Sequence, residues 1–130
     1  MIYIRELTKE IPSDGDHYIN LTHLHYKLNV IRAAYQKPMI VTSGYRTKEE
    51  HFSIYKKKGV DVWNIPTKSQ HLIGAAADIS DPQGDIKNWV TNNITLMEKL
   101  DLYMESFDIT TSWLHFQLFQ PNSGKRFFYP

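Results

Sequence analysis

The chain has 130 residues, no cysteine, and 15 Lys and Arg residues against 14 Asp and Glu residues, a formal net charge of +1. This length predicts one domain with its own core, and the lack of cysteine excludes disulfides, thiolate metal sites and a cysteine nucleophile. The near-zero charge argues against a general nucleic-acid-binding surface, and no apolar run approaches the ~18 residues of a membrane span. Because charged residues interrupt the N-terminal stretch, we expect no secretory signal.

The first predicted elements are a long helix and a short strand. Apolar side chains recur at spacings of three and four from about residue 20 to residue 35, which predicts an amphipathic helix capped by Asn20 or Thr22. Pro38 ends this helix because proline cannot continue it. Residues 39–43 are apolar and β-branched, as is typical of a buried strand.

A second helix and a second strand are predicted in the middle of the chain. Thr47 and Glu50 have the spacing of a capping box, and Gly59 suits the position after a helix end, so a short helix is expected between them. A loop follows, and Ala75–Ile79 reads as a short strand. After a turn, a further helix is predicted to extend to about Met97.

Two strands close the predicted fold, at residues 102–105 and 113–119. Their clearest apolar residues have even numbers, and side chains alternate between the faces of a strand, so a hairpin would bury the even set. Glu105 and His115 belong to the odd set, which places them within reach of each other on the opposite face. We therefore predict a single α+β domain over residues 1–130, with a small, mainly antiparallel sheet packed against two or three helices.

The densest chemical signal is the segment Ser69-Gln-His71-Leu-Ile-Gly74-Ala-Ala76-Ala-Asp78. His71 offers an imidazole nitrogen and Asp78 a carboxylate oxygen, and both are ligands of Zn²⁺. Gly74 permits a sharp turn between these two residues, and Ala76 leaves room on the face of the strand that carries Asp78. The Ser69 hydroxyl could hold a neighbouring group in place.

A third ligand is available in His115, on the last strand. Two histidines and one carboxylate leave an open coordination position, as in catalytic zinc sites, although the same set also suits non-haem iron. Taken singly, His71 reads more readily as an ordinary loop histidine, and Asp78 as a turn carboxylate. The complete segment together with a strand histidine favours the metal site.

These residues resemble the signature of the zinc D-alanyl-D-alanine carboxypeptidase family of murein peptidases. The segment Ser69–Asp78 carries the main signature, Ser43-Gly44-Tyr45-Arg46-Thr47 is similar to a second family segment, and Trp113-Leu-His115 is similar to the family's final strand. The likeness extends from about residue 21 to residue 117. The short chain and its C-terminal sequence look most like the phage-encoded branch.

The resemblance implies that His71, Asp78 and His115 bind zinc and that Arg46 and Ser69 face the substrate. A guanidinium is well shaped for a peptide carboxylate, although Arg46 taken alone is equally well explained by a surface salt bridge. The implied activity is endolysin-like hydrolysis of a murein stem-peptide bond that involves a D-amino acid, by a carboxypeptidase or an endopeptidase.

The general base is the point at which the chain departs from this family. Many members have an acid three residues before the last zinc histidine, and others have one two residues after it. Ser112 and Gln117 occupy these positions here, and neither can take a proton from water at neutral pH. Glu105 is our candidate because it shares a face with His115, and Asp108 is the second; the alternative for Glu105 is a solvated carboxylate at a strand edge.

Two alternatives to an enzyme stay open from the sequence. One is a non-catalytic virion structural protein that reuses the fold, which the missing acids favour, and the other is a module that binds stem peptides without cutting them. For the enzyme, we expect zinc as the cofactor and the murein stem peptide as the partner, with no nucleic acid or membrane; other virion proteins are further candidate partners. We expect a phage-encoded protein, in the host cytoplasm or the virion, that acts on the cell wall. His51, on the helix after Arg46, is a weaker candidate for the cleft.

Overall fold

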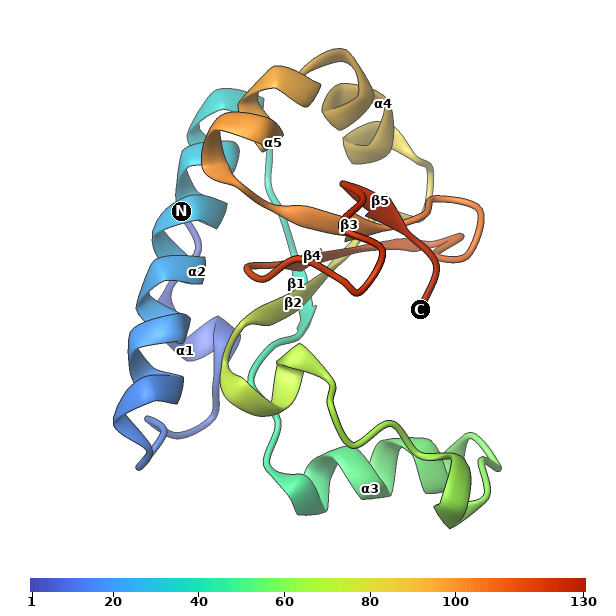
Figure 1. The fold of residues 1–130 in the computed structure, drawn as a ribbon. Coiled ribbons are helices and arrows are strands. Elements are labelled where there is room, and N and C mark those ends of the chain that lie inside the picture. Colours follow the sequence, from blue (N-terminus) through green and yellow to red (C-terminus); the bar gives the residue numbers. More distant parts are fainter.

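The chain forms five α-helices, two 3₁₀ helices and five short strands. The computed structural model describes residues 1–130. Its elements are, in chain order, α1 (Ile4–Leu7), α2 (Gly15–Tyr35), β1 (Val41–Ser43), α3 (Lys48–Lys57), the 3₁₀ helices η1 (Val62–Asn64) and η2 (Gln70–Ile73), β2 (Ala76–Ser80), α4 (Asp85–Asn92), α5 (Ile94–Leu100), β3 (Tyr103–Glu105), β4 (Trp113–Gln117) and β5 (Phe127–Phe128). The strands cross the middle of the protein, with α4 and α5 on one side and α3 on the other (Figure 1).

The five strands form one sheet in the order β1-β2-β4-β3-β5. Neighbouring strands are antiparallel except for β3 and β5, which are parallel. This arrangement confirms the predicted α+β fold with a mainly antiparallel sheet. It also brings β2 directly beside β4, so that the segment rich in ligand residues lies against the last predicted strand.

The two faces of the sheet differ because side chains alternate along each strand. Ile79 of β2 and Phe116 of β4 are fully buried in an apolar core that also receives side chains from α2, α4 and α5. Asp78 and His115 are paired residues of the same two strands and lie on the opposite face. The burial of the even-numbered apolar residues in the last two strands is confirmed.

Helix α2 begins at Gly15, so the predicted caps at Asn20 and Thr22 are wrong. Asp14 is the cap, because its carboxylate accepts hydrogen bonds from the backbone N–H groups two and three residues later. The predicted apolar face of the helix is confirmed. Its buried residues are Leu21, Leu24, Leu28 and Ile31.

The helix predicted to extend to Met97 is interrupted at Asn93, which separates α4 from α5. Asn93 has non-helical backbone angles (φ −129°, ψ 33°), and its side-chain amide donates a 2.8 Å hydrogen bond to the carbonyl oxygen of Trp89. An asparagine can compete for backbone hydrogen bonds in this way and so end a helix. Met97 stays buried on α5, because both short helices cover the same core.

Both ends of the chain pack onto the body. The sequence pattern did not predict α1, which buries Leu7 beside the strand exit at Gly44; a Cβ at Gly44 would collide with the carbonyl oxygen of Leu7. At the other end, Phe128 is buried in β5, which pairs with β3, so the aromatic end of the chain also packs onto the body. None of the helices is long and apolar enough to cross a membrane.

Candidate metal centre

His71 is held in place by a tightly constrained turn. It lies on η2, which is capped by Ser69, and the Ser69 hydroxyl accepts a hydrogen bond from the His71 backbone N–H. The turn ends at Gly74, with a left-handed φ of 77°. A Cβ at Gly74 would lie 2.5 Å from the carbonyl oxygen of His17 on α2, so only glycine fits. The predicted role of Gly74 as a sharp turn is thereby confirmed.

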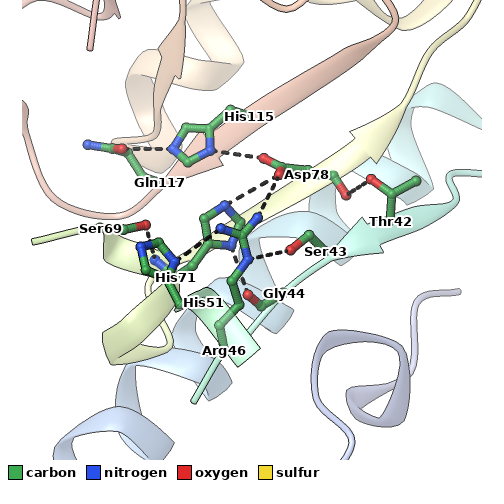
Figure 2. Close-up of polar contacts among 10 residues, drawn as sticks. All are labelled: Thr42, Ser43, Gly44, Arg46, His51, Ser69, His71, Asp78, His115 and Gln117. Carbon is green, nitrogen blue, oxygen red and sulfur yellow. Dashed lines mark hydrogen bonds and ion pairs between the residues drawn. The ribbon is translucent and has the colours of Figure 1, made fainter. Parts of the chain in front are cut away.

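Asp78 and His115 meet across the antiparallel ladder of β2 and β4. They are directly paired in register, and His115 Nδ1 lies 2.9 Å from Asp78 Oδ1. Ala76, two residues before Asp78 on the same face, is opposite Gln117 and has no bulk that could fill the site. The 3₁₀ turn brings His71 Nε2 to 3.4 Å from Asp78 Oδ2. Figure 2 shows the three side chains converging from the three segments.

The hydrogen-bond partners of the outward-facing nitrogens fix the tautomers of the two histidines. His71 Nδ1 lies 2.8 Å from the carbonyl oxygen of Gly44, and His115 Nε2 lies 2.8 Å from the amide oxygen of Gln117. Since these oxygens only accept, each outward nitrogen donates its proton. In the neutral imidazoles, the form that binds a metal, the lone pairs of His71 Nε2 and His115 Nδ1 therefore face Asp78; when an imidazole is protonated, the same nitrogen donates to the Asp78 carboxylate instead. The ligand atoms of the three residues lie within 4.8 Å of one another.

Gln117 is a site residue whose positive role the sequence analysis missed. Its amide nitrogen donates a 2.9 Å hydrogen bond to the carbonyl oxygen of Phe119, which can only accept, so its amide oxygen must face His115. Gln70 supports the same strand end, because its side-chain amide both donates to and accepts from the Phe119 backbone. The available signal was the spacing of Gln117 two residues after His115, on the same face of β4.

Burial and close contact shift the pKa values of this cluster in opposite directions. Burial lowers the pKa of His71. Burial alone would raise the pKa of Asp78, but hydrogen bonds from His115 and His71 hold it well below its usual range. Burial alone would lower the pKa of His115, but the hydrogen bond and charge of Asp78 raise it. Asp78 is therefore an anion between two imidazoles, the arrangement that a divalent cation requires.

Arg46 lies at the edge of the cluster. Its Nε donates a 2.9 Å hydrogen bond to Ser43 Oγ, and one terminal nitrogen lies 3.6 Å from Asp78 Oδ2 (Figure 2). Its backbone N–H donates to the carbonyl oxygen of His71, which ties the strand exit to the ligand turn. The side chain is therefore fixed between β1 and the ligand set, with its guanidinium on the wall of a cavity over that set.

A cavity of about 390 Å³ opens over the cluster. Glu105 lines it together with all three candidate ligands, and the negative charge of Glu105 contributes to the raised pKa of His115. Ser112 also lines this cavity but carries no acid. Asp108, the second predicted base, lies elsewhere, where its exposed carboxylate accepts hydrogen bonds from Ser106 and Tyr129. The structure thus places Glu105, and not Asp108, beside His115.

Comparison with known proteins decides the family. A family model described as Peptidase M15 matches residues 5–115. The chain belongs to the Peptidase M15 family. Searches of curated proteins and of solved structures gave no match. This membership confirms the predicted relation to zinc peptidases, while the D-alanyl-D-alanine specificity and the phage-encoded branch stay predictions.

The residues of this M15 chain fit a zinc ion. M15 peptidases are zinc-dependent, and zinc takes neutral imidazole nitrogen and carboxylate oxygen ligands, often with three protein ligands in catalytic sites. His71, Asp78 and His115 supply such a set, and both imidazoles already have their outward N–H groups bonded. Family membership and this donor set together support a metallopeptidase.

Proposed function

We propose that this protein hydrolyses a peptide bond of the murein stem peptide in a zinc-dependent reaction. The observation that carries the proposal is one cavity that contains three convergent ligand atoms, a separate carboxylate and a guanidinium. His71, Asp78 and His115 would hold the ion. When bound, zinc supplies a Lewis acid that polarises the scissile carbonyl and lowers the pKa of water.

Glu105 is the proposed general base and acid. It is the carboxylate that shares the cavity with the ligand set without having a ligand position of its own. In the reaction, it takes a proton from the attacking water and gives it to the leaving amine. Its place on β3, beside β4, would let it compensate for the family acids that Ser112 and Gln117 replace.

Arg46 is the proposed clamp for a substrate carboxylate. Its side chain is only 11% exposed and is held by Ser43, so its guanidinium is oriented before substrate arrives. A fixed guanidinium binds a carboxylate with less loss of conformational freedom than a mobile surface cation. Lys58 lines the same cavity and adds a second positive charge for an anionic peptide end. Ser69, which also lines it, is the proposed neutral contact.

The cavity is not closed on its far side. A second hollow of about 850 Å³ shares Tyr55, Ser69, Glu105 and His115 with the first and continues between the 60–70 loop and the C-terminal tail. His115 and Glu105 therefore lie where two hollows join. A chain that extends in both directions from the scissile bond would fit, which favours an endopeptidase over an enzyme that removes one terminal residue.

The proposed setting is that of a phage-encoded protein, in the host cytoplasm or built into the virion, whose substrate is the cell wall. A non-catalytic virion protein is the competing proposal, favoured by the loss of the usual acids at Ser112 and Gln117. In that case the metal site would be retained without turnover. The position of Glu105 in the cavity weighs against this alternative, because it returns a carboxylate to the site.

Metal analysis and digestion of purified murein test the proposal, using wild type, His71→Ala, Glu105→Gln and the control Glu98→Gln on the exposed face of α5. We expect wild type to bind zinc and release new amino groups, and His71→Ala to lose both properties. Glu105→Gln should keep zinc but lose about 10²–10⁴-fold in rate, the usual contribution of a general acid–base residue. Equal digestion by wild type and His71→Ala would refute the hydrolase, and zinc binding without digestion by wild type would favour the virion alternative.

A further inference from the structure

Helix α3 has one buried side chain, and it is a histidine. His51 is 2% exposed, although the rest of this ten-residue helix is exposed or half-buried. Burial of an imidazole is unfavourable unless both nitrogens find partners, so its contacts need an explanation. His51 lies five residues after Arg46, on the first helix beyond the strand exit.

Both ring nitrogens of His51 are engaged. Nε2 lies 2.6 Å from the carbonyl oxygen of Pro66, and Nδ1 lies 3.3 Å from a terminal nitrogen of Arg46. The carbonyl oxygen can only accept, so Nε2 carries the proton and Nδ1 keeps its lone pair. A guanidinium can only donate, so the lone pair of Nδ1 is the acceptor it requires. The Tyr55 ring packs beside the imidazole, with ring centroids 4.8 Å apart.

Three contacts thus surround the guanidinium of Arg46. Ser43 Oγ accepts from Nε, His51 Nδ1 accepts from one terminal nitrogen, and Asp78 Oδ2 lies 3.6 Å from the other (Figure 2). We propose that His51 is a positioning residue for Arg46, with its tautomer set by the Pro66 carbonyl so that its lone pair fixes the guanidinium over the cavity. The inference deepens the proposed function, because Arg46 is the proposed clamp for the substrate carboxylate.

The same contact links two walls of the site. Pro66 belongs to the loop that leads to Ser69 and the ligand turn, and this loop also lines the second hollow. His51 therefore joins this loop to Arg46 through one imidazole. The charged group that faces the ring is Arg46, and no carboxylate is hydrogen-bonded to it. The neutral form is the one that this environment requires, since a protonated Nδ1 would oppose the guanidinium.

Zinc-loaded wild type, His51→Phe, His51→Gln and the exposed α3 control Ser53→Ala test the inference. The Phe variant keeps an aromatic ring without nitrogens, whereas the Gln variant keeps a donor and an acceptor. With a stem-peptide substrate, His51→Phe should raise KM about 10-fold or more, the range of a hydrogen bond to a charged group. Its kcat and its zinc affinity should stay near the wild-type values, and His51→Gln should recover most of the loss.

A double-mutant cycle separates positioning from a merely structural role. If His51 acts through Arg46, then His51→Phe combined with Arg46→Met should have the KM of Arg46→Met alone. Multiplication of the two single effects would overturn the proposal. So would an unchanged KM in folded His51→Phe.

Nitrogen-15 NMR of the wild-type protein reads the geometry without any activity. A His51 ring protonated at Nε2 and an Arg46 Nε–H signal that shifts in His51→Phe but not in Ser53→Ala are expected. A proton on Nδ1, or an unshifted Arg46 signal, would overturn the proposal. Because this measurement needs no substrate, failure of the proposed hydrolase and failure of the His51 inference are distinguishable.

Discussion

The two faces of the β2–β4 pair are made from alternate residues of the same strands, yet they are stabilised differently. On one face, Ile79 and Phe116 pack within a core of 18 buried apolar residues drawn from helices and strands alike. On the other, the Asp78 carboxylate contacts His71, Arg46 and His115, and His115 is hydrogen-bonded in turn to Gln117. Apolar contacts are numerous and non-directional, whereas each hydrogen bond on the site face has a defined donor and acceptor. Changes on the first face should therefore alter stability, and changes on the second should alter metal binding.

The largest expected effect is on the core face. Phe116→Ala removes a fully buried ring and should lower the free energy of unfolding by about 3–5 kcal/mol, the usual cost of such a cavity. Urea unfolding followed by circular dichroism measures it. The control is Phe119→Ala, because that side chain is 48% exposed and should change stability by no more than ~0.5 kcal/mol. Equal effects at the two positions would contradict the assignment of faces.

The corresponding change on the site face is Asp78→Asn. It keeps the size of the side chain but removes the anion between the two imidazoles and Arg46. Zinc affinity, measured by calorimetry against a competing chelator, should fall by more than ~100-fold. That value is the upper range for loss of a residue that only hydrogen-bonds to a metal ligand. The control Ser80→Ala, two residues further along the same face, should bind zinc as wild type does. Retained affinity in Asp78→Asn would remove this carboxylate from the ligand set.

A smaller loss of zinc affinity is expected at Gln117, which hydrogen-bonds to the candidate ligand His115. Gln117→Leu removes the acceptor that keeps the proton of His115 on Nε2, and zinc affinity should fall by about 10–100-fold. Gln120→Leu, at an exposed position beyond the strand, is the matched control. The same titration measures both variants. An unchanged affinity in Gln117→Leu would mean that the tautomer of His115 does not depend on this amide.

Much of the fold could be predicted because it depends on local periodicity. The helix at Lys48–Lys57 follows from its cap at Thr47 and the glycine after its end, and the faces of β3 and β4 follow from alternation. The break at Asn93 was missed because apolar spacing continues through it while one side-chain hydrogen bond interrupts the helix. The parallel pairing of β5 was also out of reach, since a two-residue strand depends on tertiary contact.

Part of the ligand set could also be predicted from local periodicity. Alternation placed Glu105 and His115 on one face, and the short spacing from His71 to Asp78 marked the segment that β2 presents to that face. The partners of these residues were not predictable. The ring of His51 is oriented towards Arg46 by the carbonyl oxygen of Pro66, which comes from the loop after α3, and this tertiary contact is encoded by no local pattern.

The smallest predicted effect concerns acidity at His51, away from the ligands. Burial first, and the charge of Arg46 as well, lower the pKa of His51 below its ordinary value of 6.5, although the Pro66 carbonyl opposes this. Between the folded pKa and 6.5 the unfolded chain binds more protons, so this contribution is fully present above pH 6.5 and is lost as the pH falls through the folded pKa. His51→Gln lacks the titrating group, so the wild-type advantage in urea unfolding should shrink between about pH 7 and about pH 5. An advantage that stays constant or grows on acidification would mean that the buried imidazole accepts its proton without opposing Arg46, contrary to the neutral form that its two hydrogen-bond partners require.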